Sequence, residues 1–302
     1  IHLNQAAKLS NKPGPPLVED SGQIVLNYAD IYDAYIGVYS RGNDNDTVAN
    51  CYITSSDLCG IKTQNGNLVV TDTKIDQIDT GYGIYVDSCH PTIADDSLVS
   101  CEHGIYLYKS KASIRDCVIR GPGATGIYMY HRADTGVTNA ATLVNVEVSN
   151  THTQHIYSAI GNLDIDSCSL VSPNFAAERS DYGIATSFTS YLKLRNTLIK
   201  DYDAAGLITG YSTTSHWDLG QDGAGEYGNN SMYSNDTADY YAIDASNSGP
   251  TFKAERNWWG SASPDSSIFA VYDTFHVDFV PYLTTRAVLR ITFRLRRSCG
   301  CG

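Results

Sequence analysis

The sequence predicts an all-β solenoid in which short parallel strands wind into stacked coils. The first observation is a glycine followed by an apolar residue, which recurs from Gly37 at spacings of 23, 23, 21, 22, 29, 28 and 23 residues. The second is an apolar-x-polar-x-x-apolar signature that recurs between these glycines with the same period. A period of about 22 residues leaves no room for a helix of about ten residues, so each repeat is expected to be one coil of short strands and turns.

The glycine signature places one predicted strand in each coil. The apolar residue is expected to point into the core, and the glycine suits a turn that requires positive φ. The copies are Gly37-Val38, Gly60-Ile61, Gly83-Ile84, Gly104-Ile105, Gly126-Ile127, His155-Ile156 with histidine in place of glycine, Gly183-Ile184 and Gly206-Leu207.

The polar slot of the second signature is predicted to lie at a bend between strands. An inward Asn or Asp side chain there would satisfy backbone groups and stack on its neighbour one coil away, so Asp72, Asp95 and Asp116 are expected to be structural. The apolar slots accept Ile, Val and Leu freely, which disfavours a leucine-rich repeat. The copies are Leu26-x-Tyr28-x-x-Ile31, Val48-x-Asn50-x-x-Ile53, Val70-x-Asp72-x-x-Ile75, Ile93-x-Asp95-x-x-Leu98, Ile114-x-Asp116-x-x-Ile119, Leu143-x-Asn145-x-x-Val148, Ile165-x-Ser167-x-x-Leu170 and Leu194-x-Asn196-x-x-Ile199.

The fading of the repeat divides the chain into four predicted segments. Residues 1–21 are an N-terminal segment or cap, and residues 22–219 are regular coils. Residues 220–284 are degenerate coils with a tryptophan-containing C-terminal cap. Residues 285–302 form a basic tail that departs from the pattern, as either a non-native addition or a real extension, and that carries no functional prediction.

The C-terminal segment carries a family resemblance. It reads Asn257-Trp258-Trp259-Gly260, then Pro264, then Val277-Asp278-Phe279-Val280-Pro281-Tyr282-Leu283. Behind coils of this period, that ending resembles bacterial secreted proteins of the pectin-lyase-like superfamily over about residues 22–284. The resemblance implies a single-domain right-handed parallel β-helix of about ten coils, with the tryptophans covering its end. It also implies a secreted or cell-surface location, and the start at Ile1 is interpreted as a processed or trimmed chain.

The charge balance disfavours two classes of partner. The chain has 33 Asp and Glu against 21 Lys and Arg, and five of these basic residues lie in the last 17 positions, so the remainder carries a charge of −17. A negative chain repels phosphate backbones, and no run of about 18 apolar residues occurs. We therefore expect neither nucleic-acid binding nor a membrane span. The oligomeric state is not predicted.

The eight cysteines are not expected to form a disulfide framework. Cys51, Cys117 and Cys168 each follow the polar slot directly, so they share one position on different coils. At about 4.8 Å per coil they lie roughly 14 Å and 10 Å apart, which is too far for a disulfide. They are expected to fill the core as thiols, while a Cys89–Cys101 bridge stays open.

Tyrosines are predicted to line one outer face of the solenoid. The residue after each inward apolar residue should point to solvent, which gives a column of Tyr39, Lys62, Tyr85, Tyr106, Tyr128 and Tyr157. A second outward column holds Asp87, Tyr108 and Tyr130. Tyrosine faces bind the apolar faces of sugar rings, so a polysaccharide lying along the solenoid is the predicted partner. The alternative is that these rings only stack on one another.

Basic residues are predicted to gather at the turn beyond these strands. Lys109, His131 and Arg132, with His90 and Lys111, fall on three consecutive coils beside Tyr108 and Tyr130. Cleavage of a uronate by β-elimination needs a base, a proton donor and a cation, and Lys or His, Tyr, and Arg supply these groups. Lys109, His131, Arg132, Tyr108 and Tyr130 are therefore the candidate catalytic residues. The alternative is a solvated turn.

The sequence thus predicts a polysaccharide-binding protein and leaves cleavage open. One alternative is a non-catalytic adhesion, surface or structural solenoid, and another is a glycoside hydrolase with paired carboxylates. The Asp95-Asp96 pair lacks the accompanying motifs of polygalacturonases, so no role is transferred to it. The loop Asn43-Asp44-Asn45-Asp46 offers oxygen ligands for Ca²⁺ but lacks EF-hand spacing, which favours a plain turn; no other cofactor is predicted.

Overall fold

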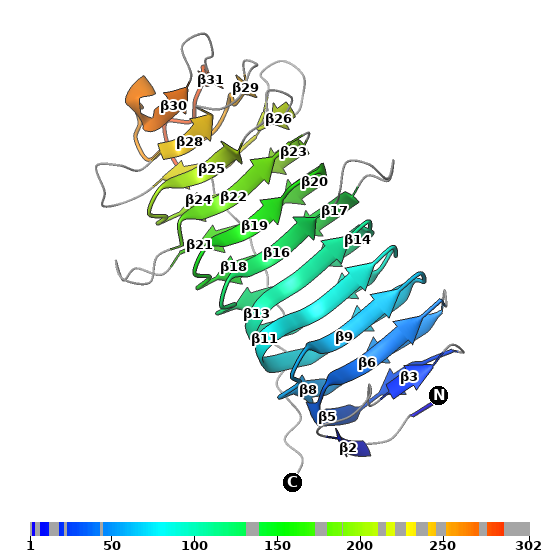
Figure 1. Ribbon diagram of the computed structural model, residues 1–302. Coiled ribbons are helices and arrows are strands. Elements are labelled where there is room, and N and C mark those ends of the chain that lie inside the picture. The colour runs from blue at the N-terminus through cyan, green and yellow to red at the C-terminus, as the bar shows by residue number, and fades with distance from the viewer. Residues whose placement is uncertain are drawn as a thin grey trace.

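The chain folds as a solenoid with three strands in each coil. The computed structural model describes residues 2–3, 7–11, 18–20, 23–42, 45–130, 139–172, 180–188, 190–210, 216–220, 228–233, 241–245, 252–271 and 277–286. Every strand pairing within it is parallel, and each strand pairs with the matching strand of the next coil (Figure 1). The strands therefore form three long faces, which we call face A, face B and face C. This confirms the predicted all-β parallel β-helix.

Face A is a 12-stranded sheet. Its strands are β1 (His2–Leu3), β4 (Val25–Asn27), β7 (Asp46–Ala49), β10 (Leu68–Thr71), β12 (Thr92–Ala94), β14 (Lys111–Arg115), β17 (Asn139–Val144), β20 (Gly161–Asp166), β23 (Ser190–Arg195), β26 (His216–Asp218), β29 (Phe252–Lys253) and β31 (Val277–Asp278).

Face B follows face A in each coil. Its strands are β2 (Ala7–Asn11), β5 (Ala29–Ala34), β8 (Tyr52–Thr54), the first parts of β11 (Lys74–Asp87) and β13 (Ser97–Tyr108), β15 (Val118–Arg120), β18 (Glu147–Ser149), β21 (Ser169–Val171), β24 (Leu198–Lys200) and β27 (Ser231–Tyr233).

Face C completes each coil. Its strands are β3 (Val18–Asp20), β6 (Ile36–Arg41), β9 (Cys59–Gln64), the second parts of β11 and β13, β16 (Thr125–Tyr130), β19 (Gln154–Ser158), β22 (Tyr182–Ser187), β25 (Ala205–Gly210), β28 (Tyr241–Ala245) and β30 (Phe269–Val271), the last preceded by the 3₁₀ helix η2 (Ser266–Ile268).

Apolar side chains from all three faces fill one continuous core. In a single coil, Val70 comes from face A, Ile75 from face B and Ile84 from face C, and all three are 0% exposed. The parallel register places Ile93, Leu98 and Ile105 at the same positions of the next coil. The inward apolar positions of both sequence signatures are therefore confirmed.

The polar slot of the repeat is a left-handed turn, which corrects the predicted inward ladder. Asn50, Asp72 and Asp95 have φ values of 51°, 51° and 58°, and their side chains are partly or fully exposed. Among residues with a Cβ, Asn and Asp tolerate this conformation best. The slot therefore favours Asn and Asp for their backbone preference. The predicted contact between slot residues of neighbouring coils also occurs, since Asn145 Nδ2 donates to Asp116 Oδ1 at 2.7 Å.

Inward polar side chains do occur in several coils, one residue after this slot. The Thr73 amide donates to Asp96 Oδ1 at 2.7 Å, and the Thr197 amide donates to Asn230 Oδ1 at 3.0 Å. Asp96 and Asn230 are buried. These side chains thus satisfy backbone groups at the corner between faces A and B, where the sheet hydrogen bonds are interrupted.

The repeated glycines are required by close packing between coils, not by the positive φ that the sequence suggested. A Cβ on Gly104 would lie 2.5 Å from the carbonyl oxygen of Gly126 and 2.7 Å from Ile119 Cγ2, both in the next coil. The same contact with the carbonyl of the following coil occurs at Gly37, Gly60, Gly83, Gly126 and Gly183. The described positive-φ glycines are other residues.

His155 occupies the glycine position in one coil and is fully buried. Its Nδ1 shares a hydrogen bond with the Tyr202 hydroxyl from two coils further on, and the Tyr202 ring lies against Gly183 in the coil between them. Burial lowers the pKa of His155 to about 3, so the imidazole is neutral at physiological pH. The pair fills the interior where the glycine column is interrupted.

The described cysteines are all buried free thiols. Cys51, Cys117 and Cys168 occupy equivalent slots, as predicted, and their thiols donate to nearby carbonyl groups. Cys89 and Cys101 are not bridged. Burial raises the pKa of the Cys117 and Cys168 thiols, so they are uncharged core residues. Cys299 and Cys301 lie outside the described residues.

Aromatic residues close the C-terminal end of the core. Trp259 is buried and packs edge-on against Phe269 at 5.0 Å between ring centroids. Phe279 contacts Phe269 and Tyr282. Trp259 is therefore part of the core at this end of the described coils, and its role as a cap stays a prediction.

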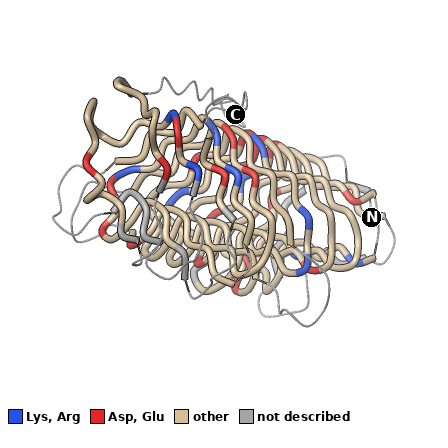
Figure 2. The backbone as a smooth tube through the Cα atoms, turned by 90° about the horizontal axis from the view of Figure 1, so that it is seen from above, with Lys and Arg blue, Asp and Glu red and all other residues tan. Residues whose placement is uncertain are grey.

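A row of alternating charges runs along the outside of face A toward the C-terminal end. The parallel register places Asp164, Lys193, Asp218, Lys253 and Asp278 at one position of five successive coils. Arg195 contributes a second cation, with Nη2 2.6 Å from Asp218 Oδ2, and Lys253 pairs with Asp278. Figure 2 shows acidic and basic positions following one another along the solenoid.

Candidate functional site

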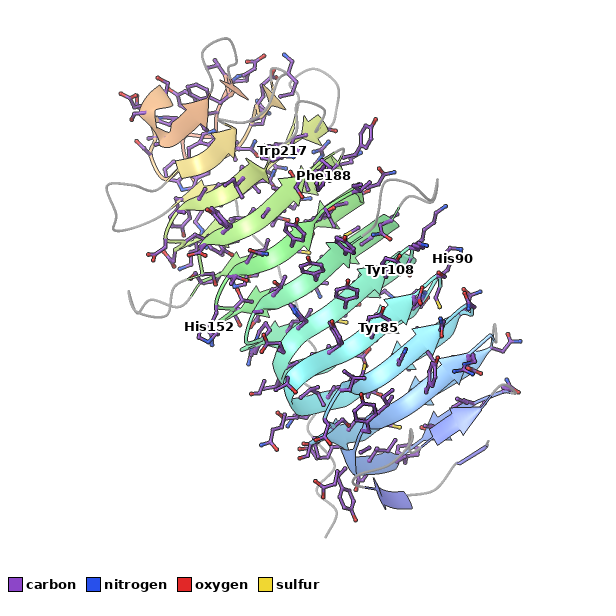
Figure 3. The ribbon with its side chains drawn as sticks, viewed as in Figure 1. Tyr85, His90, Tyr108, His152, Phe188 and Trp217 are labelled. Atoms are coloured by element: carbon purple, nitrogen blue, oxygen red, sulfur yellow. The ribbon has the colours of Figure 1, made fainter. Side chains whose placement is uncertain are left out.

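Face C carries the predicted tyrosine column. Its register aligns Tyr39, Lys62, Tyr85, Tyr106, Tyr128 and Tyr157 on six consecutive coils. Figure 3 shows Tyr85 on this surface of the solenoid. The sequence-predicted column is therefore confirmed as an arrangement of residues.

The rings of this column stack on one another. Tyr85 and Tyr106 have centroids 5.1 Å apart and planes 5° apart, and Tyr106 and Tyr128 are 5.1 Å and 6° apart. Tyr128 and Tyr157 lie at 4.8 Å and are tilted by 32°. The ring faces are thus covered by neighbouring rings, which corrects the expectation that they lie open to sugars. Ring edges and hydroxyls form the outer surface instead.

Cations lie at the N-terminal end of the column. The Lys62 ammonium is 5.0 Å from the centroid of the Tyr39 ring and 5.5 Å from that of Tyr85, so it lies between the two rings. The Arg41 guanidinium lies 4.8 Å from the Tyr39 centroid. Tyr39 is only 6% exposed, and its hydroxyl donates to Gln64 Oε1 at 2.7 Å. Tyr39 is therefore less accessible than the other column members.

The second predicted column lies beside the first. The register aligns Arg41, Gln64, Asp87, Tyr108 and Tyr130. Asp87 accepts hydrogen bonds from Gln64 Nε2 at 3.2 Å and from Ser88 Oγ at 2.8 Å. The Tyr108 and Tyr130 centroids are 6.3 Å apart, a looser stack than in the first column.

Two further aromatic residues on this face were missed by the sequence analysis. Tyr82 lies 4.9 Å from Tyr106, and His103 lies 5.6 Å from Tyr128, between ring centroids. Strict alternation would turn both inward, because they come two residues before an inward isoleucine. The glycine between each aromatic residue and its isoleucine, Gly83 or Gly104, is skipped in the strand pairing. This breaks the alternation of inward and outward side chains. An aromatic residue directly before the repeated glycine was the available signal.

Burial on the aromatic surface shifts the pKa values of three tyrosines and one histidine toward their neutral forms. Burial, with a smaller effect of Asp87, raises the pKa of Tyr85 to about 12. Burial also raises the pKa of Tyr106 and Tyr128 and lowers that of His103. A general base works best with a pKa near the operating pH. Tyr85, Tyr106 and Tyr128 are therefore poorly suited to proton abstraction and well suited to hydrogen bonding.

The predicted basic cluster is described only in part. Lys109 adopts a left-handed turn with φ of 50°, and its ammonium lies 5.1 Å from the Tyr108 ring centroid. His90 and Lys111 are exposed near the same corner (Figure 3 labels His90). His131 and Arg132 lie outside the described residues, so their catalytic roles stay predictions.

In the acidic loop considered for Ca²⁺, the Asp46 carboxylate is hydrogen-bonded within the protein. Asp46 is buried and accepts from the Ile24 amide at 2.8 Å and from Ser40 Oγ at 2.6 Å. Asn43 and Asp44 lie outside the described residues. Across the described part of the chain, no group of three or more His, Cys, Asp or Glu side chains is placed to hold a metal ion.

The sequence profile of the right-handed β-helix region matches residues 17–141 and 103–258. The chain belongs to this right-handed β-helix family. No curated protein sequence matches it. Among the described residues, no helix has the length and apolar character needed to span a membrane.

Several solved structures have a similar course of the chain at low sequence identity. The periplasmic alginate epimerase AlgG is 12% identical with a TM-score of 0.46, covering 90% of this chain and 67% of that one. A singly substituted form of AlgG is 14% identical with a TM-score of 0.43, covering 82% and 60%. ORF18 of Geobacillus virus E2 is 11% identical with a TM-score of 0.35, covering 91% and 56%. These likenesses concern the fold of the right-handed β-helix family alone.

Proposed function

We propose that the chain binds an acidic polysaccharide along face C. The observation that carries the proposal is the row of hydroxyls on Tyr85, Tyr106 and Tyr128. Within the described part of the chain, these hydroxyls bond to no other residue, and each is partly exposed. They recur once per coil, about 4.8 Å apart. A linear chain of sugars presents hydroxyls repeatedly along its length and can follow such a row.

The charges beside this row favour an acidic sugar. Lys62 lies within the tyrosine column, Arg41 lies beside its N-terminal end, and Lys109 lies at the adjoining corner. Two carboxylates accompany these cations: Asp87 lies in the second column, and the partly exposed Glu102 of β13 lies near His103. A row of hydroxyl groups with three flanking cations suits a uronate-bearing chain. The proposal includes a secreted or cell-surface location.

Tyrosine-to-phenylalanine replacement is expected to separate binding from stacking. A Tyr106→Phe, Tyr128→Phe double variant keeps both rings but removes two hydroxyls, each contributing about 1 kcal/mol to a hydrogen bond. We expect binding of polygalacturonate or alginate to weaken by about tenfold or more, measured by affinity gel electrophoresis. The urea midpoint should stay at the wild-type value. Wild-type binding should also weaken with added salt, because exposed charges are screened.

The matched control is Tyr28→Phe, which removes a hydroxyl from an exposed tyrosine at the corner between faces A and B. This variant should bind as the wild type does. Unchanged binding in the double variant would show that the tyrosines only stack. Ultraviolet absorbance of an unsaturated product, or new reducing ends, would show that the chain also cleaves the polysaccharide that it binds.

A further inference from the structure

Face A carries a hollow of about 390 Å³ across strands β17, β20, β23 and β26. It lies on a different side of the solenoid from the tyrosine column, toward the C-terminal half. Trp217 lines this hollow, and in Figure 3 it lies well away from Tyr85. The volume falls in the lower part of the range typical of small-molecule sites, which is about 300–1,000 Å³.

The hollow arises from side chains of unequal size in one outward column. The register aligns Ala140, Asn162 and Tyr191 on successive coils. The Ala140 side chain is small and projects little from the sheet, whereas the Tyr191 side chain is 51% exposed and projects outward. Tyr191 therefore forms an aromatic wall beside a floor of small and apolar side chains.

The charges around the hollow compensate one another. Asp164, Lys193 and Asp218 line it and belong to the alternating row of face A. Asp218 also pairs with Arg195 at 2.6 Å. Two acidic and two basic groups thus leave no net charge to attract an ion, while their oxygen and nitrogen atoms can still bond to hydroxyls.

We propose that this hollow binds a single neutral pyranose unit. The Tyr191 ring, which is 51% exposed, packs against the apolar C–H face of the sugar. The Asn162 amide and the Asp164 carboxylate bond to its hydroxyls. The site differs from face C in ligand charge, in place and in size, so it extends the proposed function with a second sugar site.

Trp217 provides the readout, because it lines the hollow and is 5% exposed. The full chain is titrated with methyl β-glucoside, methyl β-galactoside, methyl α-mannoside and N-acetylglucosamine at millimolar concentrations. We expect a saturable change in tryptophan fluorescence with at least one of them. Trp217→Phe should lose that change while calorimetry still detects binding, because Trp258 and Trp259 lie elsewhere, in the C-terminal cap region.

Tyr191→Ala tests the wall of the site. We expect it to weaken pyranose binding by about tenfold or more, since stacking on an aromatic ring is lost. Polygalacturonate retardation should remain, which separates this site from face C, and Tyr28→Ala serves as the matched control. The proposal is overturned if no sugar gives a saturable change, if Tyr191→Ala binds normally, or if the change persists in Trp217→Phe.

Discussion

Replacing Gly104 by alanine is expected to destabilise the fold by about 3 kcal/mol. The added Cβ would lie 2.5 Å from the Gly126 carbonyl oxygen and 2.7 Å from Ile119 Cγ2. The first contact is with backbone, so no side-chain rotation relieves it, and the coils must separate locally. Equilibrium unfolding in urea, followed by circular dichroism, measures the loss.

Gly123→Ala is the matched control for this substitution. Its Cβ would approach Glu102 Oε2 at 2.8 Å, which is the end of a flexible side chain that can move. We expect a change of less than about 0.5 kcal/mol. A wild-type midpoint for Gly104→Ala would show that the coils are packed less closely than the structure indicates.

Replacing Asp96 by asparagine is expected to stabilise the protein at pH 8 by about 1–3 kcal/mol. Asp96 is 2% exposed, and within the described residues its Oδ2 has no hydrogen-bond partner. Burial raises the pKa of Asp96 well above its usual range, and the Asp72 and Asp95 carboxylates add to this. Asparagine fits the slot, since Asn230 occupies the same position and donates to the carbonyls of Leu194 and Leu219.

The pH dependence of this effect has a definite sign. When folding raises the pKa of a carboxyl group, the group contributes to stability at low pH. This contribution is complete at pH values below the pKa of the group in the unfolded state. That stability is lost as the pH rises through the folded-state pKa. The wild type should therefore lose stability relative to Asp96→Asn between pH 5 and pH 8. Urea midpoints of both proteins at these two pH values measure the difference.

Asp95→Asn is the control for Asp96→Asn, because Asp95 is the exposed neighbour in the left-handed turn. It should change stability by less than about 0.5 kcal/mol. A destabilised Asp96→Asn protein, or a gap between it and the wild type that does not change with pH, would contradict a protonated Asp96 in the core.

The sequence predicted what depends on local period. Val70, Ile75 and Ile84 point inward because each falls at a fixed place in a repeat of about 22 residues, and the tyrosine column follows from the same register. The residue types at the corners were harder to interpret. Asn50 was placed in an inward ladder because its amide can bond. It does donate to Asn27 Oδ1 of the preceding coil at 2.9 Å, but from a left-handed turn at the surface, so the inward direction was wrong.

The remaining errors involve contacts between coils. Whether Gly104 serves a turn or a close approach is decided by the Gly126 carbonyl, 22 positions away, which no local pattern reveals. Tyr82 and His103 were missed because the skipped glycine shifts the alternation by one residue. The openness of the tyrosine faces also depended on ring orientation, which spacing along the chain does not specify.

The alternating row on face A limits how this part of the solenoid can grow by duplication. Duplication of only the coil that carries Lys193 would place two ammonium groups at adjacent positions of the row. Duplication of only the coil that carries Asp218 would place two carboxylates at adjacent positions. Like charges directly opposite each other are destabilising. Copying two adjacent coils together keeps the signs alternating. Lengthening of the C-terminal half is therefore favoured in units of two coils. Insertions and deletions in this part of the solenoid are expected to add or remove a pair of coils and not a single one.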